Sequence, residues 1–174
     1  MKILVLSTSL HPASRSRILA KHVVPALEEA GAEVVYIDLK DHPLPLCDGA
    51  DAYGHPNLPG LAAAVRNADA IIAATPVYNY DVGSSLKNLL ELTGKNWQGK
   101  TVGFLLAAGG QGSYMGVMSF ANSLMLDFRC LIIPRFVYAT GDCFDGETIS
   151  SENVAARVEG LAKETVRLAG ALAE

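Results

Sequence analysis

Short aliphatic runs alternate with longer amphipathic segments along the chain. Four runs hold several consecutive hydrophobic or β-branched residues, the pattern of strands buried on both faces of a sheet. They cover residues 3–6, 33–39, 70–75 and 101–108. A fifth run, residues 131–139, contains Pro134, which cannot donate a ladder hydrogen bond. We therefore expect the fifth strand at an edge of the sheet.

Between these runs, hydrophobic residues recur at the three- and four-residue spacing of a helix that buries one face. This spacing predicts helices from about residue 14, over residues 58–66, after residue 85, over residues 114–127 and after residue 151. Pro25 predicts a kink or a break near Val24 in the first helix, and Gly31 predicts its end. Residues 41–59 are rich in Pro, Gly and Asp without periodicity, which indicates a long loop.

Strands that alternate with helices predict an α/β fold with a doubly wound, five-stranded parallel sheet and helices on both faces. The common strand order for five strands is 2-1-3-4-5, and ligands bind beyond the carboxyl ends of the strands where this order reverses. That rule brings residues 7–17, 76–85 and 109–113 around one crevice. No repeat or linker divides the chain, so residues 1–174 are interpreted as one domain.

The amino-acid composition argues against several classes of function. A net charge of −4 argues against a general surface for nucleic acid or an anionic membrane. No apolar run is long enough to span a membrane, and the N-terminus lacks a signal-peptide core. The three cysteines form no CxxC pair, and neither they nor the four histidines have metal-ligand spacing. We therefore expect a cytoplasmic protein with reduced thiols and no metal.

The segment after the first strand has the chemistry of a phosphate site. Serine and threonine hydroxyls, with His11, Arg15 and Arg17, lie where a strand runs through a turn into a helix. Such a turn aims backbone N–H groups and the positive end of the helix dipole at one point. The alternative interpretation is an ordinary turn in which Ser14 caps the helix.

The other two predicted loops suit a flat heterocycle. Residues 76–80 combine a proline-stiffened turn with two tyrosine rings, and Gly109, Gly110 and Gly112 let a backbone approach a ring closely. Surface aromatics or a subunit contact, and a plain flexible turn, are the respective alternatives. No G-x-G-x-x-G follows the first strand, and neither a Walker A motif nor a G-x-S-x-G elbow occurs.

These segments resemble the NAD(P)H-dependent FMN reductases, a family with the flavodoxin-like fold. Residues 7–16, STSLHPASRS, are similar to the family's first loop, with Thr8 and His11 in place of its glycine and arginine. Residues 76–88, PVYNYDVGSSLKN, resemble its second signature, with Gly83 and Ser84 in place of Pro and Gly. Residues 44–48, LPLCD, and the two glycines after the fourth strand fit as well.

The resemblance implies the cofactor-binding residues. Ser9, His11, Ser14, Arg15 and Ser16 would hold the FMN phosphate. The isoalloxazine would be lined by Pro76, Val77, Tyr78, Asn79 and Tyr80, and on its other side by Gly109, Gly110 and Gln111. The resemblance names no catalytic side chain, because the cofactor carries the chemistry.

The implied activity is an oxidoreductase that passes a hydride from NADPH or NADH to bound FMN and then reduces a small-molecule acceptor. Family members also form homodimers or homotetramers, and Tyr80, Asp81 and the loop 41–59 are the candidate contacts. Two other functions stay open: an electron carrier of the flavodoxin type, and a flavin-free interaction scaffold. A carrier usually has a threonine-rich phosphate loop, which this chain lacks.

Overall fold

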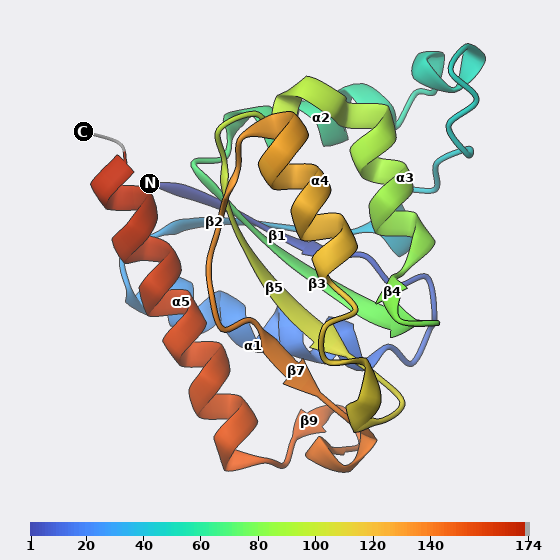
Figure 1. Cartoon of the computed structure of the whole chain (residues 1–174). Coiled ribbons are helices and arrows are strands. Elements are labelled where there is room, and N and C mark those ends of the chain that lie inside the picture. The colour runs from blue at the N-terminus through green and yellow to red at the C-terminus, as the bar shows by residue number, and fades with distance from the viewer. Residues whose placement is uncertain (173–174) are drawn as a thin grey trace.

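A mostly parallel sheet forms the centre of the protein in the computed structural model, which describes residues 1–172 (Figure 1). In spatial order its main strands are β2 (Glu33–Asp38), β1 (Lys2–Ser7), β3 (Ala70–Tyr78), β5 (Thr101–Ala107) and β6 (Leu131–Ile132). These strands pair in parallel, and the edge strand is continued by β7 (Val137–Ala139), which also pairs with β5. The predicted 2-1-3-4-5 order is confirmed. The last two residues of the predicted domain, 173 and 174, lie outside the described part.

The edge strand is interrupted at Pro134, the proline from which the sequence predicted an edge position. β6 pairs with Thr101 and Val102, and β7 pairs with residues 105–107, so pairing stops around Pro134. The next residue, Arg135, has a φ of 62° and bends the chain outward before β7 begins. A central strand would lose a ladder hydrogen bond at such a proline, which is why the interruption lies at the edge.

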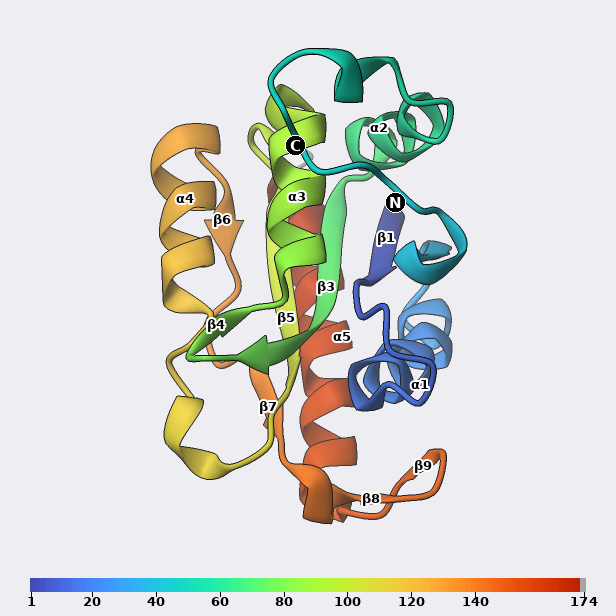
Figure 2. The same cartoon turned by 90° about the vertical axis from the view of Figure 1, so that its right-hand side faces the viewer.

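Helices cover both faces of the sheet and make three layers (Figures 1 and 2). Packed on one face are α1 (Arg15–Glu29) and α5 (Glu152–Leu172), and on the other α2 (Leu58–Asn67), α3 (Ser84–Thr93) and α4 (Met118–Phe128). Alternate residues of β1 enter the two resulting cores: Ile3 faces the α1 and α5 side, and Leu4 faces the other. This two-residue period follows from the strand's pleat.

Short elements complete the chain. Two-residue strands form hairpins: β4 (Asp81–Val82) pairs with β3, and β8 (Phe144–Asp145) pairs with β9 (Thr148–Ile149). The 3-10 turns are η1 (Leu39–Asp41), η2 (Asp51–Gly54), η3 (Gly94–Trp97), η4 (Gln111–Ser113) and η5 (Gly141–Cys143).

The first helix decides between two predicted outcomes at Pro25 and confirms its predicted end. Of the kink or break predicted near Val24, the break does not occur, since α1 continues through Pro25. Pro25 is exposed, so water can reach the backbone carbonyl one turn earlier that loses its partner. Gly31 ends the helix with a φ of 89°, and the N–H groups of Gly31 and Ala32 bond to the carbonyls of Glu28 and Leu27 at 2.9 and 3.0 Å. These two bonds form a Schellman motif, for which glycine is favoured.

The helix expected over residues 114–127 begins four residues late. Gly116 explains the delay, because a Cβ there would lie 3.0 Å from Val77 Cγ1 and 3.1 Å from the backbone carbon of Tyr80. The segment before α4 is therefore pressed against the β3–β4 hairpin as an irregular turn. This contact couples the loop after β5 to the loop after β3.

Candidate functional site

A cleft of about 910 Å³ lies at the carboxyl edge of the sheet, beyond the ends of β1, β3 and β5. The parallel register places these ends together, with Ser7 opposite Ala74 and Pro76 opposite Ala107. Sequence-predicted residues that line the cleft are Ser9, His11, Ser14, Arg15, Ser16, Pro76, Val77, Tyr78, Asn79 and Gly109. Tyr80, Gly110 and Gln111 do not line it. Three loops far apart in sequence thus meet at one site.

The start of α1 supplies hydrogen-bond donors to this cleft. Ser14 is the N-cap, and its hydroxyl accepts from the Arg17 backbone N–H at 3.2 Å. The N–H groups of Arg15 and Ser16 stand in the first turn, where a helix offers no carbonyl partner. Together with the helix dipole, they favour an anion in the cleft.

Three buried serine hydroxyls add donors at the same place. Ser14 Oγ and Ser16 Oγ lie 2.9 Å apart, so one donates to the other and one hydroxyl proton of the pair stays free. Ser9 Oγ accepts from the His11 N–H at 3.3 Å, which leaves its own proton available. All three serines are buried. Burial excludes competing water, which strengthens a bond to a bound anion.

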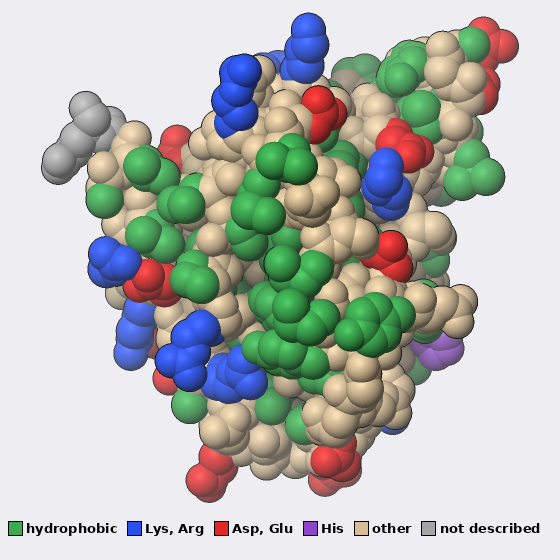
Figure 3. All heavy atoms as spheres, in the orientation of Figure 1, with side chains coloured by type: hydrophobic (Ala, Val, Ile, Leu, Met, Phe, Trp, Pro, Cys, Tyr) green, Lys and Arg blue, Asp and Glu red, His purple; other side chains and the backbone are tan. Residues whose placement is uncertain are grey.

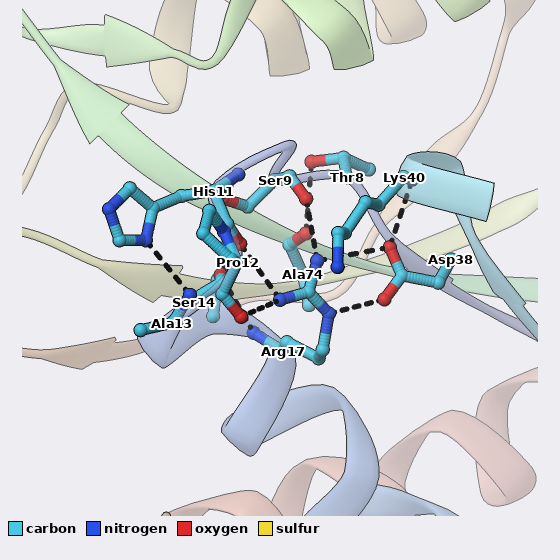
Figure 4. A network of polar contacts seen from close by, with 11 residues as sticks. Thr8, Ser9, His11, Pro12, Ala13, Ser14, Arg17, Asp38, Lys40 and Ala74 are labelled. Atoms are coloured by element: carbon cyan, nitrogen blue, oxygen red, sulfur yellow. Dashed lines mark hydrogen bonds and ion pairs between the residues drawn. The ribbon is translucent and has the colours of Figure 1, made fainter. Parts of the chain in front are cut away.

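Arg17 holds the first loop in shape (Figure 4). Its guanidinium binds Asp38 at the end of β2 and donates to the carbonyls of Ser9, His11 and Pro12 at 2.9, 2.9 and 3.0 Å. The hydrogen bond that Arg17 donates to Asp38 is the main cause that raises the pKa of Arg17. The guanidinium of Arg17 is therefore occupied by Asp38 and the loop carbonyls.

His11 and Arg15 bring different groups to the cleft. His11 Nδ1 accepts from the Ala13 N–H at 3.1 Å, which leaves Nε2 as the ring nitrogen that can face a ligand. The Arg15 guanidinium lies against Gly141, where a Cβ would come within 3.0 Å of Nη1. Within residues 1–172, no acceptor or carboxylate pairs with it by hydrogen bond or ion pair. Arg15 thus offers the uncompensated positive charge beside the serines.

The second loop is a tight hairpin rather than an open turn. Val77 pairs with Val82 and Tyr78 with Asp81, so Asn79 and Tyr80 form a two-residue turn with φ values of 50° and 66°. Two positive φ values match a type I′ turn, which suits the twist of adjacent strands. Tyr78 lines the cleft, and the side chains of both Tyr78 and Tyr80 are exposed.

Polar bonds fix this hairpin to its neighbours. The Gly83 N–H bonds to the carbonyl of Pro76 at 3.0 Å and to Thr75 Oγ1 at 3.2 Å. The Ser85 hydroxyl donates to the carbonyl of Thr8 in the first loop. The geometry of the first loop and the geometry of the hairpin are consequently linked through the first turn of α3.

The third loop is anchored from behind by the edge strand. Tyr138 donates its hydroxyl to the carbonyl of Gly110, and the Gln111 side chain donates to Thr140 Oγ1 at 3.0 Å. The side chain of Gln111 is thereby directed to the edge strand. Gly109 remains the residue of this loop that lines the cleft.

Sequence reasoning missed the wall of the cleft formed by the β8–β9 hairpin. Phe144, Gly146 and Glu147 line the cleft there, opposite Ile18 and Lys21 of α1. The two turn residues are Gly146 and Glu147, and a glycine with positive φ at the first turn position is typical of a type II′ hairpin. This signal could have identified the turn, though not its position beside α1.

A second feature lies on the opposite side of the β3–β4 hairpin. A groove of about 500 Å³ runs between α3, α4 and the loop 41–59. The loop is held there by Asn88, which accepts from the Cys47 N–H at 2.8 Å and donates to the carbonyl of Pro45 at 2.9 Å. Hydrophobic side chains gather beside it over α4 (Figure 3). We call Tyr80, Tyr114, Met115, Met118, Met125 and Leu126, all exposed, the α4 patch.

Two features are absent from residues 1–172. None of the helices there has both the length and the apolar character that a membrane crossing requires. No set of three His, Cys, Asp or Glu side chains in that part of the chain is arranged to hold a metal ion.

Comparisons with known proteins agree with the predicted family and fold. The family model described as NADPH-dependent FMN reductase matches residues 1–144. A NAD(P)H-dependent FAD/FMN reductase from Geobacillus thermodenitrificans is 28% identical, over 97% of this chain and 93% of its own. The NADH-dependent FMN reductase SfnF from Pseudomonas fluorescens is 30% identical, over 98% and 92% of the two chains.

A solved structure gives the corresponding match in three dimensions. The flavoenzyme NAD(P)H:(acceptor) oxidoreductase FerB from Paracoccus denitrificans aligns with a TM-score of 0.79 at 19% identity, covering 98% of this chain and 97% of its own. The architecture is the flavodoxin-like one.

Proposed function

The chain belongs to the NADPH-dependent FMN reductase family, and from this premise we propose that FMN binds in the carboxyl-edge cleft. The protein is an NAD(P)H-dependent oxidoreductase. Its phosphate site is assigned to Ser9, His11, Ser14, Arg15 and Ser16. The observation that carries this assignment is that three buried serine hydroxyls and the first turn of α1 line the same cleft.

The donor set fits a phosphate dianion. Ser9 and the Ser14–Ser16 pair each keep a hydroxyl proton to donate, and the first-turn N–H groups add more. Where the family has an arginine, His11 has only Nε2 left to donate, because Nδ1 is occupied by the Ala13 N–H, and Arg15 supplies a permanent positive charge. A charged donor to a phosphate forms a bond about twice as strong as a neutral one.

The flavin ring system is assigned to the space between the second and third loops. Pro76, Val77, Tyr78 and Asn79 line one wall, and Gly109 lines the other. Tyr80, Gly110 and Gln111 act from outside the cleft: Tyr80 completes the hairpin turn, and the last two hold the third loop against the edge strand. A rigid wall orients a flat ring without using side-chain acids or bases.

FMN, when bound, supplies the redox chemistry by accepting a hydride from NADPH or NADH and reducing a small-molecule acceptor. The chain's own residues bind the phosphate, orient the ring and shield one side of it from water. The exposed tyrosine rings at positions 78 and 80 leave the outer side open to nicotinamide and acceptor in turn. Residues 1–174 are assigned to one domain, and the free thiols at Cys47, Cys130 and Cys143 support a cytoplasmic location.

A homodimer or homotetramer is part of the proposal. The α4 patch is a surface on which several large hydrophobic side chains lie exposed, and such surfaces mark contacts between proteins. Tyr80 belongs to this patch and stands two residues after Tyr78, which lines the cleft, so a second subunit there would lie close to the flavin site. Asp81 and the loop 41–59 border the same surface. Sedimentation of the purified protein, with Leu126→Glu for comparison, tests the assembly.

The function is tested by adding NADPH or NADH anaerobically to protein that has been saturated with FMN. Rapid bleaching of the flavin absorbance, followed by recovery when a quinone is added, is the expected result. Protein that binds FMN but ignores both nucleotides would instead be an electron carrier. Protein that takes up no FMN would be a scaffold, and the site assignment would be wrong.

A further inference from the structure

A chain of side-chain hydrogen bonds runs behind the third loop. The Gln111 amide donates to Thr140 Oγ1 at 3.0 Å, and the Thr140 hydroxyl donates to the Asp142 carboxylate. Both directions are fixed, because a carboxylate only accepts and the Thr140 hydroxyl has a single proton. The bond from Thr140 is also the main cause that lowers the pKa of Asp142. Thr140 is buried, Gln111 and Asp142 are exposed, and none of the three lines the cleft.

One end of this chain holds the wall that is assigned to the flavin ring. Gly109 lines the cleft without a side chain, so the course of the third loop decides where this wall lies. Two bonds tie the loop to the edge strand: the one from Gln111 to Thr140, and the one from the Tyr138 hydroxyl to the carbonyl of Gly110. Thr140 directly follows β7, so the bond from Gln111 anchors the loop to the end of the sheet.

The other end of the chain holds the turn against which Arg15 packs. η5 begins after Thr140, and the Cys143 N–H closes it on the Thr140 carbonyl at 3.0 Å. A Cβ on Gly141, the first residue of this turn, would lie 3.0, 3.1 and 3.2 Å from Nη1, Cζ and Nη2 of Arg15. Three nearly equal distances mean that the flat face of the guanidinium lies over Gly141. The bond from Thr140 to Asp142 spans this glycine, so it fixes the surface on which Arg15 rests.

We propose that Thr140 is a positioning residue for FMN, because its one hydroxyl holds both the third loop and the turn under Arg15. The inference rests on the proposed function, in which Gly109 lies beside the ring and Arg15 binds the phosphate. A long side chain that is placed before the ligand arrives loses less conformational freedom on binding, and a pre-organised wall has the same advantage. Thr140 therefore contributes to affinity without touching the flavin.

The test compares the affinities of the flavin-free, full-length protein for FMN and for riboflavin, measured by quenching of flavin fluorescence. Riboflavin lacks the phosphate, so the ratio of the two affinities reports the phosphate site alone. Thr140→Val removes the hydroxyl at nearly constant volume. It should weaken riboflavin by about threefold through the ring wall, and FMN by about tenfold through the ring wall and Arg15 together. Thr140→Ser should restore both affinities.

The matched control is Thr165→Val. Thr165 is buried like Thr140, and its hydroxyl donates to the carbonyl of Leu161 within α5 at 2.7 Å. The same substitution there removes a buried hydroxyl that holds no loop of the cleft. It should change neither flavin affinity.

Substitutions at the two exposed ends of the chain separate the two effects. Asp142→Ala should lower the FMN-to-riboflavin ratio and leave riboflavin nearly unchanged, whereas Asp142→Asn keeps an acceptor oxygen and should keep the ratio. Gln111→Ala should weaken both flavins equally. In an Arg15→Gln background, Thr140→Val should no longer change the ratio, because the two residues act on the phosphate as one unit. A purely structural loss would not depend on Arg15 in this way.

The outcomes distinguish this inference from the proposed function. If the wild type does not bind FMN, the proposed function itself is overturned. If it binds FMN, an unchanged ratio in Thr140→Val, an equal change of the ratio with and without Arg15, or a failure of Thr140→Ser to restore affinity overturns only the role of Thr140. If circular dichroism shows that Thr140→Val does not fold, Asp142→Ala decides, and an unchanged ratio in that variant overturns the inference.

Discussion

Replacing Arg17 by leucine should unfold the first loop and abolish tight FMN binding. One guanidinium bonds to Asp38 on β2 and to three carbonyls of the loop. Leucine keeps the apolar stem and removes all of these bonds. The Asp38 carboxylate would be left with a single remaining partner, the Lys40 N–H at 3.1 Å.

The burial of the pair sets the expected magnitude. The side chains of Arg17 and Asp38 are 11% and 9% exposed, so the pair is largely withdrawn from water. Removing one partner of a buried ion pair costs about 3–5 kcal/mol, because the other charge stays buried and unpaired. Local opening of the loop can relieve part of this, since a loop opens at a lower free energy than the whole domain. We therefore expect a loss of about 2–4 kcal/mol in the free energy of unfolding.

Urea denaturation followed by circular dichroism measures this loss, and flavin fluorescence measures FMN affinity in the same samples. The matched control is Arg167→Leu, since Arg167 pairs with Glu164 on α5 at 65% and 36% exposure. Exposed pairs contribute little, so this control should leave both quantities nearly unchanged. If Arg17→Leu costs less than about 1 kcal/mol, as an exposed pair would, the argument that Arg17 shapes the loop is refuted.

Four other substitutions have defined outcomes. Ser14→Asp should keep the stability of the helix, because aspartate also caps helices, yet weaken FMN binding by at least about tenfold, because its carboxylate repels the phosphate. Ser14→Asn also caps the helix but carries no charge, so it should not repel the phosphate. Equal FMN affinity in the wild type and both variants would contradict the phosphate site. Gly141→Ala should displace the Arg15 guanidinium, 3.0 Å from the new Cβ, and weaken FMN several-fold without a change in melting temperature. Tyr80→Gly should raise the free energy of unfolding by about 0.5–1 kcal/mol by relieving its positive φ, while weakening subunit association in sedimentation. Burial raises the pKa of the Cys130 thiol to about 11, so the unfolded state loses this proton first as the pH rises. The free energy of unfolding should therefore fall between about pH 9 and pH 11. Urea titrations of Cys130→Ala over the same pH range should show a shallower fall.

Local chemistry explains why the polar ends of the elements could be predicted well. Ser14 caps α1, Ser151 accepts from the Val154 N–H at the start of α5, and Gly31 closes α1. Each of these roles depends on a residue's own side chain and on neighbours within a few positions. Pro25 shows the limit of such reasoning, because its cost depends on whether the helix face it occupies is solvated.

Long-range contacts decided which residues actually meet in the cleft. Arg17 and Arg15 are equivalent cations in the sequence, but Asp38 lies beside β1 and engages Arg17, while Gly141 receives Arg15. Gln111 is directed to Thr140 for the same reason, since the edge strand ends there. No pattern within the first loop or the third loop contains this information.

The sequence by itself determined the alternation of strands and helices, the strand order and the three loops at one edge, because hydrophobic period and capping are local properties and parallel sheets allow few connections. Tertiary structure alone decided that Arg17 pairs with Asp38 whereas Arg15 lines the cleft. It also decided the type I′ hairpin at Asn79 and Tyr80 and the wall of the cleft formed by β8 and β9. These features arise from packing between segments remote in the chain, and their free energy depends on partners that periodicity does not specify.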